Sequence, residues 1–200
     1  MEALAQSLKA SPELYPHTLD VTADAVGLVR LSEDAFRAAS FLDARALDPG
    51  APLQWVAWPQ IEAAVEAAGL EEGCGFIFHL GHTGSTLLSR LLGAHPSVLA
   101  LREPLPLRVL AQQALEIETP ESPWGPAGLE SRAKAFLSLW SRTFTADQLA
   151  VVKATSFASG MAARLLTRPS RPKAISIYSR PEAYLATVLA GANTHLDILA

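Results

Sequence analysis

Residues 74–104, CGFIFHLGHTGSTLLSRLLGAHPSVLALREP, decide the expected fold, because they join a strand, a glycine-containing turn and an amphipathic helix. The run 76–80 is short and mostly apolar, as a strand buried on both faces of a parallel sheet requires. Leucines then recur at helical spacing over 87–92. Pro96 ends this helix, and residues 98–101 can form the next strand. The alternation predicts an α/β protein with a central parallel sheet.

The turn GHTGST at 81–86 has the composition of an anion cradle. Gly81 and Gly84 can adopt backbone conformations closed to other residues, and they let a ligand approach the main chain. Thr83, Ser85 and Thr86 place hydroxyl groups beside the unpaired N–H groups of a helix N-terminus. The sequence therefore predicts a site for phosphate or sulfate.

This turn differs from the loop of nucleotide hydrolases, which needs a Gly-Lys pair that is absent here. It resembles the phosphosulfate-binding loop of sulfotransferases that use 3′-phosphoadenosine 5′-phosphosulfate (PAPS), in which a basic residue precedes S/T-G-T/S-T and a leucine-rich helix. In this chain the pattern reads HTGSTLL over 82–88, and His82 occupies the position where the family usually carries Lys or Arg. The resemblance is nearest to tyrosylprotein-type and bacterial sulfotransferases and covers residues 74–187.

A second part of the resemblance is the segment AHPSV at 94–98, which is followed by Glu103. Glu103 falls at the carboxyl end of a predicted strand, where ligands bind in open α/β sheets, so it is expected to face the same crevice as the loop. By resemblance, Glu103 is the general base that deprotonates the acceptor. The alternative is a solvated loop carboxylate paired with Arg102.

A third part comprises VVKATS at 151–156 and the strand-helix segment 173–187. Lys153 resembles the lysine that ends a strand in many of these enzymes, although a lysine there can also be merely exposed. The family holds the donor's 3′-phosphate with a strand ending in R-D-P and a hydroxyl six residues after the proline. Arg180 before Pro181, together with Thr187, is the nearest match, and Ser179 stands where the family's arginine is expected.

The resemblance implies a three-layer α/β/α fold of the P-loop nucleoside-triphosphate-hydrolase-like type. It predicts an N-terminal helical or irregular extension over 1–73, packed on a nucleotide-binding domain over 74–200 that is incomplete at its C-terminal end. The implied reaction moves a sulfuryl group from PAPS, the co-substrate, to a hydroxyl or amine of a small-molecule, peptide or glycan acceptor, with His82 stabilising the leaving group and no metal required. Two alternatives remain: a nucleotide-dependent phosphotransferase, and a non-catalytic binding module of the same fold.

Composition limits the partners. A net charge of −4 and a pI near 5.7 argue against a nucleic-acid surface. Cys74 is the single cysteine, so an internal disulfide is impossible and a reducing, cytoplasmic location is expected. No apolar run approaches the length of a membrane span.

His79 alternates with apolar strand residues and is expected to be a core histidine. The stretches 47–59 and 119–128 are expected to be loops.

Overall fold

The structure, a computed structural model, describes residues 2–47, 52–120 and 122–190. It is a mixed α/β fold whose main sheet is four-stranded and entirely parallel, with strand order β5-β6-β4-β7. All four predicted strands are confirmed: β4 (Gly75–His79), β5 (Val98–Arg102), β6 (Leu149–Lys153) and β7 (Ala174–Ile177). Strands β4, β5 and β6 are almost wholly buried, which explains their continuous apolar runs.

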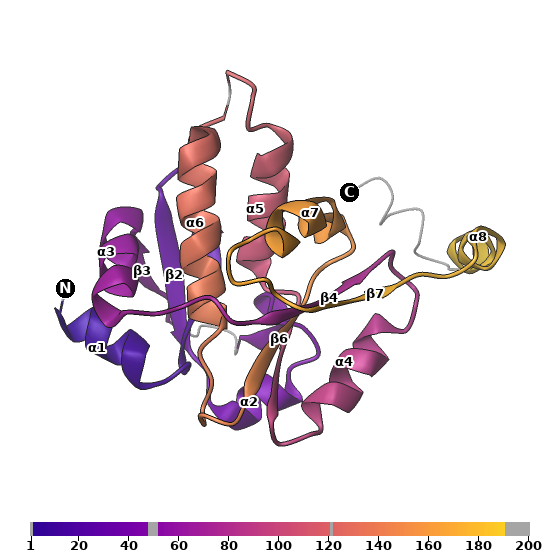
Figure 1. Ribbon diagram of the computed structural model, residues 1–200, viewed down its shortest axis with the longest axis horizontal. Helices are drawn as coiled ribbons and strands as arrows, with labels where there is room; N and C mark the ends of the chain where they lie inside the picture. The colour runs from indigo at the N-terminus through magenta and orange to yellow at the C-terminus, as the bar shows by residue number, and fades with distance from the viewer. Residues whose placement is uncertain (1, 48–51, 121, 191–200) are drawn as a thin grey trace.

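Helices cover both faces of this sheet (Figure 1). One face carries α4 (Ser85–Gly93) and α2 (Glu33–Ala38), and the other carries α5 (Leu105–Leu115), α6 (Gly125–Trp140), the 3₁₀ turn η2 (Phe157–Met161) and α7 (Ala162–Leu166). Helix α6 begins at Gly125, so the predicted loop 119–128 is wrong over its last four residues; Pro126 is well tolerated in the first turn of a helix. No helix among the described residues is long and apolar enough to cross a membrane.

The strand order creates a topological switch point between β4 and β6. The chain leaves β4 through α4 and reaches β5 on one side, whereas it leaves β6 through α7 and reaches β7 on the other. Right-handed crossovers in opposite directions require helices on opposite faces, as Figure 1 shows for α4 and α7. The carboxyl ends of β4 and β6 therefore open into a crevice of the kind in which α/β proteins bind ligands.

The N-terminal segment contains a second sheet, so the prediction of a helical and irregular extension over 1–73 is incomplete. Strands β1 (Leu14–Asp20), β2 (Ala25–Arg30) and β3 (Gln54–Ala57) pair antiparallel in that order. A proline inside an apolar run argues against a strand, so the sequence did not predict β1. The structure accommodates Pro16 because β1 is an edge strand whose register shifts after this residue. β3 lies in the stretch 47–59 that had been predicted as a loop, of which 48–51 lie outside the described residues.

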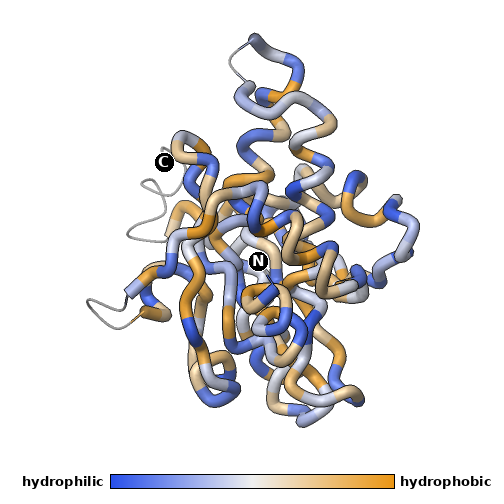
Figure 2. Tube along the Cα trace, turned by 90° about the vertical axis from the view of Figure 1, so that its left-hand side faces the viewer, coloured by the Kyte–Doolittle hydropathy of each residue, from blue (hydrophilic) through white to orange (hydrophobic). Residues whose placement is uncertain are grey.

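Helices α1 (Glu2–Ala10) and α3 (Trp58–Ala68) and the 3₁₀ turn η1 (Ala44–Ala46) complete this segment. It shares one hydrophobic core with the rest of the chain. Trp58 stacks on Phe136 of α6 with ring centroids 6.2 Å apart, and the buried Arg142 donates hydrogen bonds to the carbonyl oxygens of Leu8, Ser11 and Leu14. In Figure 2 the loops at the top and bottom of the view are mostly hydrophilic, as expected around a common core.

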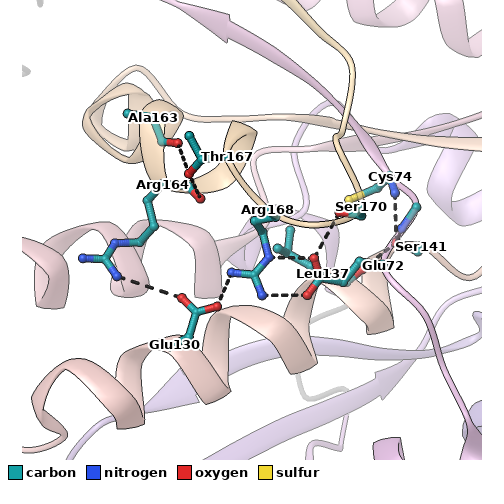
Figure 3. A network of polar contacts seen from close by, with 11 residues as sticks. Glu72, Cys74, Glu130, Leu137, Ser141, Ala163, Arg164, Thr167, Arg168 and Ser170 are labelled. Carbon is teal, nitrogen blue, oxygen red and sulfur yellow. Dashed lines mark hydrogen bonds and ion pairs between the residues drawn. The ribbon is translucent and has the colours of Figure 1, made fainter.

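A polar network fixes the approach to β4 (Figure 3). Arg168, which follows α7, is buried and donates to both carboxylate oxygens of Glu72 at 2.6 Å, and to Glu130 of α6 at 2.6 Å. The Ser141 hydroxyl accepts hydrogen bonds from the backbone N–H groups of Gly73 and Cys74. These contacts hold the segment just before β4 against α6.

The C-terminal helix α8 (Pro181–Ala190) confirms the helix predicted within the segment 173–187. Helix α8 has no buried residue and lies beyond β7 (Figure 1). β7 itself is largely exposed, in contrast to β4, β5 and β6.

Candidate anion-binding site

The loop that follows β4 has the backbone of an anion cradle. Gly81 and Gly84 have φ values of 81° and 79°, in the left-handed region that favours glycine, and His82 between them has φ 47°. Gly84 is the N-cap of α4, with no side-chain hydrogen bond capping the helix. The first N–H groups of α4 therefore point toward the crevice without a helical acceptor, and they are the donors that a phosphate or sulfate group uses.

Open volume and a hydroxyl group without a hydrogen-bond partner also favour a ligand at this loop. A Cβ atom built on Gly84 would meet no atom within 4 Å among the described residues. The hydroxyl oxygen of Thr83 is buried and has no hydrogen-bond partner in the described part of the chain. His82 is exposed, Thr86 is half-buried and Ser85 is buried. The loop thus offers one open position, one orphaned hydroxyl and one accessible imidazole.

Helix α4 packs on the sheet through small residues, although its leucines dominate the sequence pattern. Its buried positions are Ser85, Ser89 and Gly93, whereas Leu87 and Leu91 are each 63% exposed. A Cβ on Gly93 would lie 2.9 Å from the Cβ of Ala100 on β5, so the helix approaches the sheet closely. Close packing along this row of small side chains fixes the helix N-terminus beside the ends of the strands.

Glu103 and Lys153 meet across the ends of β5 and β6. The Glu103 N–H donates to the Lys153 carbonyl oxygen at 2.8 Å, and the Lys153 ammonium forms an ion pair with Oε1 of Glu103. Lys153 is 1% exposed and its Nζ lies 5.5 Å from the centroid of the Phe41 ring, while the Glu103 side chain remains 20% exposed. The carboxylate is thus held by a buried cation and still reaches solvent.

This arrangement decides two alternatives that the sequence leaves open. Lys153 is buried, so the interpretation of an exposed strand-end lysine is wrong. Arg102 does not pair with Glu103; its guanidinium turns toward α2 and donates to the carbonyl oxygens of Phe36 and Ala39. Glu103 has φ 56°, a conformation that costs a non-glycine residue free energy and commonly marks a functional site.

His79 also belongs to this edge of the sheet, and the sequence predicts only its core position. That part is confirmed, since His79 is 7% exposed and both ring nitrogens are bonded. Nε2 lies 2.9 Å from the Ala154 carbonyl oxygen, and the Gly81 N–H donates to Nδ1 at 2.9 Å. The signal in the sequence was a polar residue at the end of a buried strand, two positions before the first loop glycine.

The residues expected to hold a 3′-phosphate lie on the β7 side of the crevice and beyond it. The Ser179 hydroxyl follows β7, the neighbour of β4, and is buried without a partner among the described residues. Arg180 is exposed. Thr187 is exposed on α8, and its hydroxyl donates to the Ala183 carbonyl oxygen. No contact joins Arg180 or Thr187 to the loop in the described structure, so their role remains a prediction.

Two pockets of the described structure lie away from this loop. One of about 490 Å³ is lined by the Arg168 network and α7, and another of about 170 Å³ lies between α5 and η2. The candidate site is instead an open cradle at the edge of the sheet. Within the described ranges, no group of three His, Cys, Asp or Glu side chains is placed to hold a metal ion.

Comparisons with known proteins identify no relative of this chain. No protein-family model, no curated protein and no solved structure matches it. The geometry defines the class as a mixed α/β protein whose four-stranded parallel sheet has a glycine-containing loop at its switch point. The chemistry available there comes from backbone N–H groups, hydroxyls, one exposed imidazole and a lysine-held carboxylate.

Proposed function

We propose that this protein is a PAPS-dependent sulfotransferase with the P-loop-like architecture that its loop resembles. The observation that carries the proposal is the position of the cradle: the loop 81–86 and the Glu103–Lys153 pair lie at the carboxyl edge, at the switch point between β4 and β6. The resemblance over 82–88 supplies the ligand, and the orphaned Thr83 hydroxyl and the open space at Gly84 fit a tetrahedral anion.

Binding of PAPS in this proposal rests mainly on uncharged hydrogen-bond donors. Lys153 is already paired with Glu103, and Arg102 is committed to the carbonyl oxygens near α2. The loop N–H groups, the hydroxyls of Thr83 and Thr86, and the α4 macrodipole therefore bind the phosphosulfate. Such preorganised donors are typically worth about 3–4 kcal/mol each in the transition state.

In the proposed reaction the acceptor oxygen or nitrogen attacks sulfur while its proton passes to Glu103. A new bond to sulfur forms, the bridging bond between sulfur and the phosphate oxygen breaks, and adenosine 3′,5′-bisphosphate leaves. Lys153 orients the carboxylate through Oε1, and Glu103 is exposed enough for an acceptor to reach it. His82, which is exposed in the loop, meets the negative charge that develops on the leaving oxygen. By resemblance, Ser179, Arg180 and Thr187 hold the 3′-phosphate.

The competing phosphotransferase would need an acidic Mg²⁺ ligand at this edge. Glu103 is the acidic residue that follows β5, and it is held by Lys153. A non-catalytic module would bind the same nucleotide without turnover. Calorimetric titration with adenosine 3′,5′-bisphosphate and with ATP, each with and without Mg²⁺, followed by a sulfuryl-transfer assay with PAPS, separates the three functions.

We expect the bisphosphate to bind without Mg²⁺ and more tightly than ATP. Gly84→Val should abolish this binding, and Gly160→Ala, at a glycine of η2 with open space around it, provides a matched control. Mg²⁺-dependent ATP binding would favour the phosphotransferase. Absence of nucleotide binding to the folded wild-type protein would refute the proposal.

A further inference from the structure

The His79 side chain joins the loop to both strands that flank the switch point. It ends β4, and its Nε2 contacts the carbonyl of Ala154, the residue after β6. Its Nδ1 accepts from the N–H of Gly81, the first glycine of the loop, and its own carbonyl oxygen accepts from the Ser159 hydroxyl. The loop therefore begins from a fixed point.

These partners define the protonation state of the ring. A carbonyl oxygen can only accept a hydrogen bond, so Nε2 must carry a hydrogen. A backbone N–H can only donate, so Nδ1 must be unprotonated. His79 is consequently a neutral imidazole with its hydrogen on Nε2. A second proton on Nδ1 would place one N–H group against another and break the bond to Gly81.

We propose that His79 is a positioning residue that holds Gly81 in its left-handed conformation and so sets the shape of the loop, and that protonation of its Nδ1 releases the loop. The part of this inference that concerns anion affinity rests on the proposed function. The bond from the Gly81 N–H to the side chain two residues earlier has the form of an Asx turn, which fixes local backbone direction. With Gly81 fixed, the following N–H groups keep their direction toward the crevice.

The surroundings favour the neutral ring. Burial lowers the pKa of His79, the charge of Lys153 lowers it further, and the Ala154 carbonyl and Glu103 oppose these effects. Titration of His79 therefore belongs below its ordinary value of about 6.5, and acidification through that window should loosen the loop. The charged groups on neighbouring elements are Lys153 at the end of β6 and Glu103 after β5, and His82 lies in the loop itself.

His82 is a second, exposed imidazole in the same loop, so its contribution has to be removed from the measurement. An experiment should therefore be made in a His82→Asn background, in which Asn also tolerates the left-handed conformation at that position. Affinities are compared within this background. The pH dependence that remains then reports on His79.

Three substitutions separate the two bonds of the ring. His79→Asn retains an acceptor near Nδ1 that can receive the Gly81 N–H, but it does not reach Ala154. His79→Gln reaches Ala154 with its amide and gives up the Asx-like turn. His79→Phe keeps the volume of the ring and loses both bonds. Two readouts are measured at pH 7.5 and 5.5: hydrogen exchange of the Gly81 amide, and the dissociation constant for adenosine 3′,5′-bisphosphate.

We expect the Gly81 amide to be protected from hydrogen exchange in the parent, which is the His82→Asn protein, and in its His79→Asn variant. The amide should exchange faster in the His79→Gln and His79→Phe variants. Affinity should fall about 3- to 10-fold in those two variants, in line with the loss of one hydrogen bond. The parent should lose affinity from pH 7.5 to 5.5, whereas His79→Asn should not. Imidazole nitrogen spectra of the parent should show a hydrogen on Nε2 alone at pH 7.5.

A hydrogen on Nδ1 at pH 7.5, or equal Gly81 exchange in the Asn and Gln variants, would overturn the inference without reference to any ligand. Equal affinity of those two variants for the bisphosphate would overturn its binding part. If the wild-type protein, with His82 in place, binds no bisphosphate but the exchange rates follow the expected order, the loop role of His79 stands and the proposed function fails. The two failures are therefore distinguishable.

Discussion

Removal of the Glu103 carboxylate should destabilise the protein as well as slow its proposed reaction. Glu103→Gln leaves the Lys153 ammonium, which is 1% exposed, without its counter-charge. Breaking a buried ion pair by removing one partner typically costs about 3–5 kcal/mol. Since the Glu103 side chain is 20% exposed and Gln can still accept one hydrogen bond, we expect a cost just below that range, about 2–3 kcal/mol.

The partner substitution should cost less. Lys153→Met fills a similar volume without a charge, and the Glu103 carboxylate it leaves behind can be solvated through its exposed side. We expect a loss of about 1 kcal/mol, because burial and packing are conserved. In the double variant neither charge remains, so its stability should resemble that of Lys153→Met. The coupling energy in this cycle should then be about 2 kcal/mol.

Urea unfolding of the four proteins, followed by far-ultraviolet circular dichroism, measures this coupling. For a chain of this length, a change of 2–3 kcal/mol corresponds to roughly 4–12 °C in Tm. Single-substitution effects that simply add within about 0.5 kcal/mol would refute the reasoning, since they would show that Glu103 and Lys153 are not energetically coupled. In that case the carboxylate would be held by the backbone alone. Sulfuryl-transfer assays at a temperature where all four proteins are folded report separately on general-base chemistry.

Three further predictions concern other parts of the chain. Gly84→Ala should lower stability by about 1–2 kcal/mol, because φ 79° disfavours any L side chain although the space is open; a calorimetric loss below 0.5 kcal/mol would contradict this. Arg168→Lys should cost about 2 kcal/mol in urea unfolding, since an ammonium cannot bridge both Glu72 oxygens, whereas Arg164→Lys at the 4.0 Å surface pair should change little. Burial raises the pKa of the Cys74 thiol to about 11, so iodoacetamide at pH 8 should label it only after unfolding, and rapid labelling of the native protein would show that β4 opens.

The half of the fold that contains the parallel sheet was predictable because its signals are local. The strands β4, β5 and β6 are short apolar runs that end at glycine, proline or charged residues, and the helices between them show clear periodicity. Ligands bind at the carboxyl ends of parallel strands, and this rule predicts that Glu103 lies near the loop. Each of these inferences needs a window of only a few residues.

In the N-terminal sheet, β1 and β3 lack that local signal, whereas β2 (AVGLVR, with four buried positions) carries it and was missed all the same. β1 contains Pro16 and a register shift, and β3 is four residues long with one buried position, Val56. Such strands are stabilised by their neighbours and by the shared core, to which they contribute few residues each. Apolar runs alone therefore predict loops and short helices for this segment.

The polar arrangement at the crevice depends on contacts between residues far apart in the sequence. Arg102 and Glu103 are adjacent but have different partners, and the choice of Lys153 as the partner of Glu103 requires the register in which Arg102 lies beside Lys153. His79 and Ala154 are likewise separated by 75 positions. No short motif encodes these pairings, whereas strand order and register fix them.

Backbone strain points to the same edge of the sheet by an independent route. Four non-glycine residues in the described structure have positive φ, and two of them, His82 and Glu103, lie at the carboxyl edge beside the switch point. Such conformations persist only where surrounding contacts over-determine them. At Glu103 those contacts are the backbone bond to the Lys153 carbonyl and the ion pair to the same residue, and at His82 the neighbouring glycines take up the turn. Stability is therefore given up at the residues for which the resemblance implies chemistry, and the fold supplies the contacts that keep them in place.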